Sequence, residues 1–204
     1  MGSMTIEIKN NLGKDVDASF VDGKICLNWA ETKRRLGDLD PGDVFKGKSE
    51  TEYIVCGHEH FETYVVRREL LNETMKFGDT NNWAESKIRK YLNEDYVRVI
   101  QGEFGNGNIV AFERDLISLD GYSDYATCVD KASVMNVLEY MKYHKYVGNC
   151  DSCHALITPN STPSGYGANG VRYVSGGGDV SCGWCNVVFG VRPFFVLKSS
   201  IFVS

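Results

Sequence analysis

Helical periodicity in this 204-residue chain is confined to its middle, and strand-like segments lie on both sides of it. A first helix is expected to begin near Thr80–Asn81, a second to begin with Ser133 as its N-cap, and residues 102–108 to form a loop between them. The side chains expected on the apolar faces are Trp83, Ile88, Tyr91 and Leu92 in the first helix and Val134, Val137, Leu138 and Met141 in the second. Because strands and helices are segregated along the chain, their order predicts an α+β fold with two helices and mixed or antiparallel sheets.

The strand-like segments are short and are separated by turn residues. Asp22-Gly23 lies between two of them and predicts a type I′ hairpin, because both central residues of that turn need a positive φ. We therefore expect residues 4–35 to form an N-terminal β-hairpin extension and residues 36–204 to form one domain. The other strands are expected at Glu52–Cys56, Thr63–Arg67, Ala155–Thr158, Val171–Val174 and Val187–Leu197, within a loop-rich C-terminal half.

Composition and charge exclude several classes of function. Hydrophobic residues make up 43% of the sequence, which suffices for a core. No apolar run approaches the roughly 18 residues that span a bilayer. The formal net charge is −5, so a surface for nucleic acid is not expected. No hydrophobic segment follows Met1–Met4 as in a signal peptide, so we expect a protein that is cytoplasmic on synthesis and does not insert into membranes.

The C-terminal part differs in composition from the rest of the chain. Residues 1–146 contain 31 Lys, Glu, Gln and Met residues, whereas residues 147–197 contain none. In the same segment 20 of 51 residues are Gly, Ser, Asn or Tyr. These four types build adaptable binding surfaces, and the missing side chains are those that lose most rotamer entropy on binding. The composition indicates a recognition surface, with the general avoidance of long side chains in tight loops as the alternative explanation.

The seven cysteines include two CxxC pairs. Cys150, Cys153, Cys182 and Cys185 are arranged with 28 residues between the pairs, a pattern that can close a tetrahedral zinc shell. The separation is longer than in common zinc modules and no basic residues flank the pairs, so free thiols are the other interpretation. Gly165–Gly170 matches GxGxxG, but a strand-prone segment follows it instead of a helix, so no dinucleotide cofactor is expected.

Five segments form a recognisable combination. They are Leu39-Asp-Pro-Gly-Asp-Val44, Glu52-Tyr-Ile-Val55, Asn81-Asn-Trp-Ala-Glu-Ser86 with Ile88-Arg-Lys-Tyr-Leu-Asn93, Asp115-Leu-Ile-Ser-Leu-Asp120 and Gly190-Val-Arg-Pro-Phe194. Together they resemble a poorly characterised domain family of gut bacteria and their phages, over about residues 36–204. That family is similar to the C-type-lectin-fold variable proteins of diversity-generating retroelements. The resemblance implies a C-type-lectin-like domain that displays a variable C-terminal surface.

Such a retroelement would leave a signature in the C-terminal segment. It rewrites adenines, so that an AAY codon becomes any NNY codon, and NNY encodes none of Lys, Glu, Gln, Met and Trp. Residues 147–197 agree with this restriction except at Trp184. The family's tryptophan pair is also absent, since Cys153-His154-Ala155 occupies its approximate place. The motifs of formylglycine-generating enzymes and the calcium-binding motifs of animal C-type lectins are absent, so the resemblance in fold carries no chemistry with it.

We therefore expect a binding module, not an enzyme, that recognises an unknown protein or glycan on a bacterial cell or phage surface and is associated with a virion or a retroelement. Tyr166, Tyr173 and Trp184 are the expected anchors. Polar contacts are expected from Asn149, Asp151, Ser152, His154, Asn160, Asn169, Asp179, Ser181 and Asn186. The core is expected to include Trp83, Ile88, Leu92, Val191 and Phe194, with Arg89 and Arg192 as cross-links to buried carboxylates or carbonyls.

Two alternative functions remain. The four paired cysteines would make the chain a structural zinc domain, and a reactive Cys182 or Cys185 would make it a thiol enzyme like the formylglycine-generating enzymes. Neither cysteine follows a predicted helix N-terminus, and only Arg172 and Arg192 are local cations. The sequence therefore gives no reason for an activated thiolate.

Overall fold

A computed structural model describes residues 16–29 and 33–204, and its fold is mixed α+β, as predicted. One helical run consists of η2 (Trp83–Glu85), α1 (Lys87–Tyr91), the π-helical η3 (Leu92–Tyr96) and α2 (Val97–Phe104), and α3 (Val137–Val147) is separate. Short 3₁₀ turns are η1 (Leu36–Asp38) and η4 (Asn106–Asn108). The strands are β1 (Val16–Val21), β2 (Lys24–Trp29), β3 (Arg34–Arg35), β4 (Val44–Lys46), β5 (Glu52–Glu59), β6 (Glu62–Arg67), β7 (Met75–Lys76), β8 (Ile109–Val110), β9 (Phe112–Asp115), β10 (Thr127–Asp130), β11 (Ala132–Ser133), β12 (His154–Pro159), β13 (Gly170–Val174), β14 (Val180–Trp184), β15 (Val188–Phe189), β16 (Phe194–Lys198) and β17 (Phe202–Val203).

The largest sheet is antiparallel, with the strand order β11–β16–β6–β5–β4 and with β8 also paired to β16. Successive residues of a strand point to opposite faces, and both faces of this sheet are apolar. Val65 and Phe195 pair directly and pack in one core with the helical run, whereas Val66 and Phe194 pack with Tyr143 of α3 in a second core. The helical run and α3 therefore cover opposite faces of the sheet.

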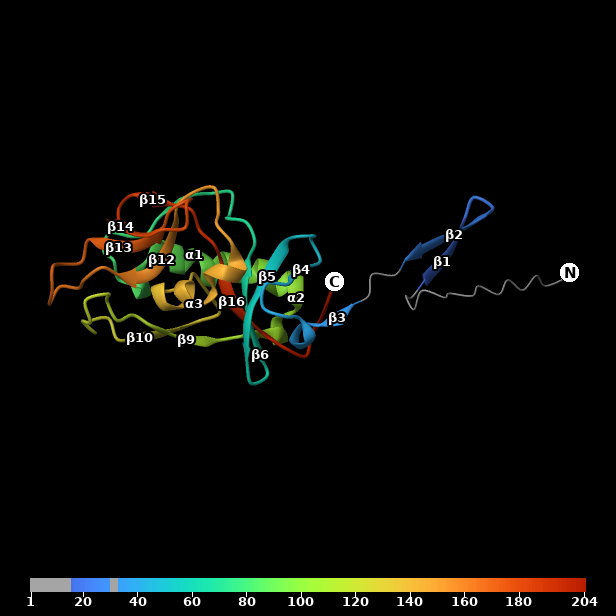
Figure 1. The fold of residues 1–204 in the computed structure, drawn as a ribbon, viewed down its shortest axis with the longest axis horizontal. Coiled ribbons are helices and arrows are strands. Elements are labelled where there is room, and N and C mark those ends of the chain that lie inside the picture. Colours follow the sequence, from blue (N-terminus) through green and yellow to red (C-terminus); the bar gives the residue numbers. More distant parts are fainter. Residues whose placement is uncertain (1–15, 30–32) are drawn as a thin grey trace, which may run out of the picture.

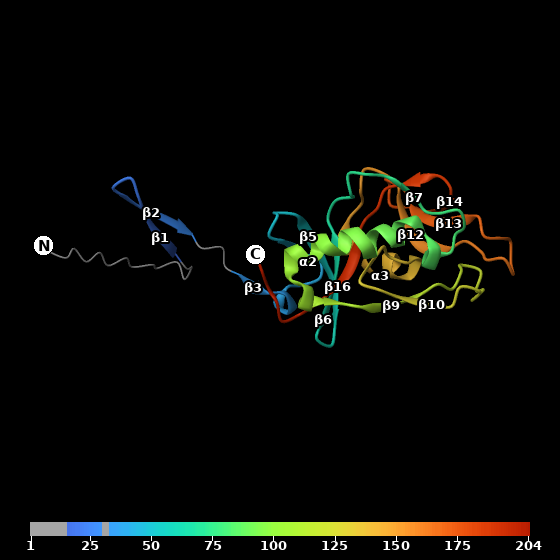
Figure 2. The ribbon, with the colours of Figure 1, turned by 180° about the vertical axis from the view of Figure 1, so that it is seen from behind.

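A smaller antiparallel sheet, β12–β13–β14, holds much of the C-terminal segment and lies at one end of the molecule (Figure 1). The C-terminus lies toward the other end, where β17 pairs with β3. Figure 2 shows the helical run extending from the region of β3 toward β12–β14. The small sheet, which holds much of the C-terminal segment, thus lies away from the end at which β17 pairs with β3.

The N-terminal hairpin forms as predicted. Strands β1 and β2 pair in antiparallel register around Asp22 and Gly23, which have φ values of 50° and 75°. Figures 1 and 2 show this hairpin apart from the other described elements, on the side of β3. The predicted extension begins at residue 4, and residues 4–15 and 30–32 lie outside the described residues.

The first helical run confirms the predicted core positions but extends further than expected. Trp83, Ile88 and Leu92 are fully buried, and Tyr91 packs against the same core while half-buried. The loop expected at residues 102–108 was wrong at its start, because α2 continues to Phe104 and ends where Gly105 adopts a φ of 86°. Within the described ranges, no helix is long and apolar enough to cross a bilayer.

The expected start of the second helix was wrong by three residues. Ser133 lies in β11, and the N-cap is Asn136, which forms a reciprocal capping box with Glu139. This start turns Leu138 and Met141 toward solvent, at 75% and 62% exposure. The buried face consists instead of Val137, Tyr140, Tyr143 and Val147, while Val134 is buried before the helix begins.

The C-terminal strand expected over residues 187–197 is interrupted. Its ends form β15 and β16, whereas residues 190–193 are irregular. Pro193 has no N–H for a ladder, and Val191 and Arg192 instead connect to residues outside these strands. Val191 and Phe194 are fully buried, as predicted.

Candidate ligand-binding site

A cleft of about 360 Å³ opens at the end of the molecule formed by β12–β13–β14. It is lined by Asn160, Ser161, Tyr166, Asn169, Cys182 and Trp184, together with three glycines. Four of these residues belong to the predicted contact set: Asn160, Tyr166, Asn169 and Trp184. The volume falls within the range of sites for small molecules, about 300–1,000 Å³.

The pleat of β13 and β14 decides which side chains reach this cleft. Gly170 is opposite Trp184 and Arg172 is opposite Cys182, so these four residues lie on one face of the two-stranded ladder. A Cβ atom on Gly170 would lie 3.0 Å from Cys182 Sγ and 3.1 Å from Asn160 Cβ. The face that carries Trp184 is therefore the face of the cleft.

The three predicted anchors divide between the two faces. Tyr166 and Trp184 line the cleft and are 95% and 64% exposed, respectively. Tyr173 lies on the other face, half-buried, with its ring centroid 5.5 Å from that of Phe189. The structure therefore does not bring the predicted anchor Tyr173 together with Tyr166 and Trp184, because its side chain points to the face of β13 opposite to the one that carries Gly170.

The amide of Asn160 is oriented by Arg172, which lies on the same face of β13 as Gly170 but does not itself line the cleft. Arg172 Nη2 donates to Asn160 Oδ1 at 2.7 Å, and a guanidinium group can only donate. The Asn160 oxygen is therefore occupied by Arg172. Within the described part of the chain, the Nδ2 group makes no hydrogen bond, so this donor is available to a ligand. Arg172 forms no ion pair with any described carboxylate.

The loop that carries Asn160, Tyr166 and Asn169 is hydrogen-bonded to Asn81, a residue of the motif at residues 81–93 that was not predicted as part of the site. Asn81 is fully buried, and its Nδ2 donates to the carbonyls of Ser161 at 2.8 Å and Gly170 at 2.7 Å. Its Oδ1 accepts from Tyr125 Oη at 2.7 Å. The signal that could have identified Asn81 is its position just before the helical run. Asn82 is the N-cap, so the buried amide of Asn81 must form its hydrogen bonds with other segments of the chain.

A second group of predicted contacts lies at the opposite end of the small sheet, in the loops before β12 and after β13. Asn149, Asp151, Ser152 and Asp179 are exposed, and Asn149 Nδ2 donates to Gly177 O at 3.0 Å. Ser181 is half-buried and is opposite Tyr173, on the face away from the cleft. Asn186 is exposed in the turn after Trp184. None of these six residues lines the cleft.

His154, predicted as a contact residue, is buried and lies outside the cleft. It is only 4% exposed, and its ring lies edge-on to Tyr140 with centroids 6.5 Å apart. Burial, with the charge of Arg192 nearby, lowers the pKa of His154 to about 4. The imidazole is therefore neutral at neutral pH, and it belongs to the scaffold.

The four paired cysteines do not converge. Cys150 and Cys185 are buried, whereas Cys153 and Cys182 are exposed. Among the residues that the structure describes, no three His, Cys, Asp or Glu side chains are grouped as a metal site would require. The arrangement therefore gives no support to a four-cysteine zinc site. Burial also raises the pKa of the Cys150 and Cys185 thiols, the reverse of what a reactive thiolate needs.

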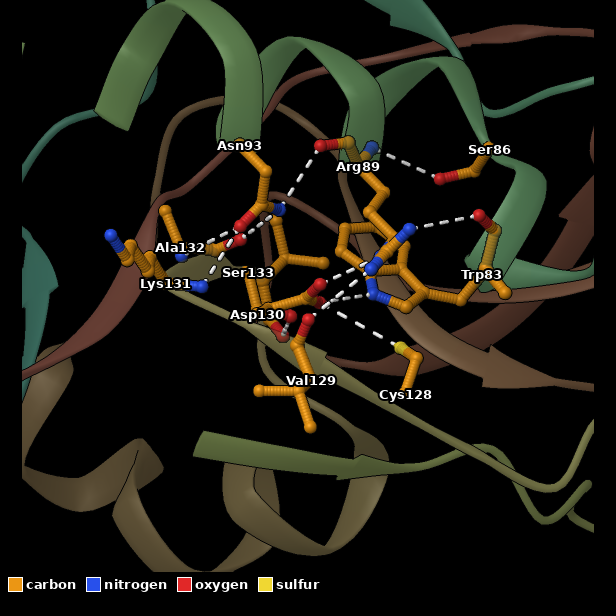
Figure 3. Close-up of polar contacts among 12 residues, drawn as sticks. Trp83, Ser86, Arg89, Asn93, Cys128, Val129, Asp130, Lys131, Ala132 and Ser133 are labelled. Atoms are coloured by element: carbon orange, nitrogen blue, oxygen red, sulfur yellow. Dashed lines mark hydrogen bonds and ion pairs between the residues drawn. The ribbon is translucent and has the colours of Figure 1, made fainter. Parts of the chain in front are cut away.

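The motif residues that follow Asn81 form a buried network away from the cleft (Figure 3). Asp130 has a fully buried carboxylate that accepts from Trp83 Nε1 at 2.7 Å and from Arg89 Nε at 2.6 Å. Asn93 extends the network by donating to Ala132 O at 2.8 Å. Ser86 caps α1 by accepting from the Arg89 N–H at 3.0 Å. The prediction that Arg89 pairs with a buried carboxylate is confirmed.

Arg192 is a second cross-link, as predicted. Its guanidinium donates to the carbonyls of Arg67, Arg68, Val147 and Gly148 at 2.7–3.1 Å. These bonds join the end of β6 to the end of α3. The group is buried, so Arg192 supports the scaffold and takes no part in the cleft.

Comparisons of the chain with protein-family models, with curated proteins and with solved structures give no match. The chemistry of the cleft itself is therefore the basis for a function. Its described lining holds two exposed aromatic rings, two amides, a hydroxyl and a thiol, and no Asp, Glu, His, Lys or Arg. Such a set can stack and hydrogen-bond a ligand, and it contains no charged acid–base pair for proton transfer.

Proposed function

We propose that this protein is a non-enzymatic binding module whose C-terminal cleft recognises a ligand on a cell or phage surface. The observation that carries the proposal is the meeting of Tyr166, Trp184, Asn160 and Asn169 in one cleft. Large aromatic side chains left exposed in a concave surface are costly unless a ligand covers them. Tyr166 and Trp184 act as anchors, and the amides provide orientation.

The proposed domain is C-type-lectin-like, and its arrangement suits display. The helical run and α3 pack on the two faces of the central sheet. The strands β12–β14, beside which the cleft opens, lie at the end opposite to β3 and the C-terminus (Figure 1). A chain attached to a larger particle, such as a virion, on the side of β3 and β17 would present the cleft outward. The exposed positions of the C-terminal segment, among them Asn149, Ser152 and Asn169, tolerate change because they contribute little to either core.

We further propose that a diversity-generating retroelement rewrites this segment. The absence of Lys, Glu, Gln and Met from residues 147–197 supports this origin, and Trp184 would be a position that is not rewritten. The test is the DNA beside the gene. A reverse-transcriptase gene with an imperfect repeat of the C-terminal coding segment supports the proposal, and the lack of both overturns it.

The binding role is tested with fluorescently labelled full-length protein on intact cells of a panel of gut bacteria, measured by flow cytometry. The double variant Tyr166→Ala/Trp184→Ala should lose about tenfold or more in affinity, because both anchors are removed. Its free energy of unfolding should change by less than about 0.5 kcal/mol, since both rings are exposed. Phe61→Ala is the matched control, because Phe61 is 87% exposed in the β5–β6 turn, outside the cleft. Equal binding by the double variant and the wild type would contradict the proposal.

A further inference from the structure

The cleft offers a hydrogen-bond donor at a fixed position. Both the side chain and the backbone of Asn160 are hydrogen-bonded. Its Oδ1 accepts from Arg172 Nη2 at 2.7 Å, and its backbone N–H donates to Gly170 O at 2.9 Å. The amide cannot turn without leaving a guanidinium N–H unpaired. The group that Asn160 presents to the cleft is therefore its NH₂, and the ligand atom placed there must be an acceptor.

Arg172 strengthens this preference. Its Nε is buried without a hydrogen-bond partner, and no described carboxylate neutralises its charge. A positive charge behind the Asn160 amide polarises the NH₂ and makes it a better donor. Oxygen acceptors such as hydroxyl, acetamido or carboxylate groups are thus favoured over donors at this point.

The wall of the cleft beside this donor is aromatic. Trp184 is opposite Gly170 in the β13–β14 ladder, so no partner side chain covers the indole from that strand, and 64% of the residue is exposed. A flat indole face attracts the C–H-rich face of a sugar ring, and it does not require charge. The described lining contains no charged side chain that would select a charged peptide.

Resting on the proposed binding function, we propose that the ligand is a saccharide, with one pyranose ring stacked on Trp184 and an acceptor oxygen bound by the Asn160 NH₂. A volume of about 360 Å³ accommodates one or two sugar rings, whereas a folded protein surface would contact mainly the rim. Arg172 is a positioning residue that acts through Asn160. The acceptor is a hydroxyl, an acetamido oxygen or a carboxylate, and the experiment separates these sources.

The experiment applies labelled full-length protein to an array of immobilised glycans that end in neutral hexoses, N-acetylhexosamines, or uronic and sialic acids. Wild-type protein should bind at least one of these groups, and the group that it binds identifies the acceptor. Asn160→Asp is the decisive variant, because its carboxylate keeps the contact with Arg172 but replaces the donor by an acceptor. We expect about tenfold weaker glycan binding and an unchanged melting temperature. Asn72→Asp makes the same chemical change at an exposed residue outside the cleft, and it should bind as the wild type does.

The outcomes distinguish this inference from the proposed function. Binding to none of the arrayed glycans overturns the saccharide assignment, and so does equal glycan binding by Asn160→Asp and the wild type. If no arrayed glycan is bound, and cell binding depends on Trp184 and is destroyed by protease but not by enzymatic deglycosylation of the cells, the ligand is a protein, and only the present inference fails. If Tyr166→Ala/Trp184→Ala leaves both glycan and cell binding unchanged, the cleft is not the ligand-binding site and both proposals fail.

Discussion

Two regions of this molecule use similar side chains in opposite ways. Around Asp130, an indole, a guanidinium and an amide find all their principal partners inside the protein (Figure 3). In the cleft, the indole of Trp184, the phenol of Tyr166 and the amide of Asn169 are exposed, and of these described side chains and Asn160 only Asn160 has a side-chain hydrogen bond within the protein. Satisfied buried polar groups contribute to stability and specify one structure, whereas exposed ones contribute little until a ligand covers them. Residue type alone thus does not separate scaffold from site, but the location of the hydrogen-bond partners does.

The largest effect should come from removing the acceptor at the centre of the scaffold network. Asp130→Ala should lower the free energy of unfolding by about 3 kcal/mol or more, because Arg89 and Trp83 would lose a buried acceptor. Urea unfolding measures the loss. Asp95→Ala is the control, since its pair with Arg98 is largely exposed and should contribute less than about 0.5 kcal/mol. Equal losses in the two variants would contradict the structural distinction.

His154 tests the boundary between the two regions, because the sequence predicted it in the site and the structure buries it in the scaffold. Its pKa is lowered to about 4 in the folded protein, so between about pH 4 and pH 6.5 the unfolded chain binds more protons than the folded one. Protonation of His154 therefore favours the unfolded chain. The free energy of unfolding is highest with respect to this group above pH 6.5, and it decreases as the pH falls toward 4, by roughly 3 kcal/mol in all.

The measurement compares urea unfolding at about pH 7 and at about pH 4.5. His154→Gln should show a smaller decrease between the two than the wild type does, because the titrating group is gone. His144→Gln makes the same substitution at an exposed histidine of α3 and is the matched control variant. A His154→Gln variant that loses as much stability as the wild type would mean that His154 does not cause the effect.

Asn81 joins the two regions, so its replacement should affect both. Asn81→Ala removes the bonds to the Ser161 and Gly170 carbonyls and should lower the free energy of unfolding by about 2 kcal/mol. It should also speed hydrogen exchange in residues 160–170 and weaken cell binding. Asn82→Ala provides the contrast, because Asn82 caps η2 and its loss should cost about 1 kcal/mol without reaching the cleft. If Asn81→Ala leaves cell binding unchanged, the hydrogen bonds of Asn81 do not position residues 160–170 for binding.

The sequence predicted the scaffold better than the site, for a physical reason. Trp83, Ile88 and Leu92 follow from local periodicity, and Arg89 could be expected to need a buried partner once it lay beside them. The cleft depends on contacts between distant segments: Asn81 reaches Ser161 and Gly170, which are 80 and 89 residues away. The opposite orientations of Tyr173 and Trp184 follow from the register of β13 and β14, which composition does not specify.

The misplaced start of α3 has a different origin. Ser133 and Asn136 are both good N-cap types, and only Asn136 has a Glu three residues later. That capping box was readable in the sequence, and it would have turned Leu138 and Met141 to solvent. At α3 a local rule is sufficient to place the helix start, whereas at the cleft no local rule is sufficient.

The smallest expected effect marks where the site ends. Asp151→Ala/Ser152→Ala changes two exposed side chains that form no hydrogen bond or ion pair within the described residues, at the end of the small sheet away from the cleft. Its free energy of unfolding should stay within about 0.5 kcal/mol of the wild-type value. Its cell binding should equal that of the wild type, because a ligand seated between Trp184 and Asn160 does not need the far loops. A loss of binding comparable to that of the Trp184 variant would mean that the ligand covers the whole length of β12–β14. The cleft would then be the central part of a larger recognition face, as the composition of residues 147–197 predicts.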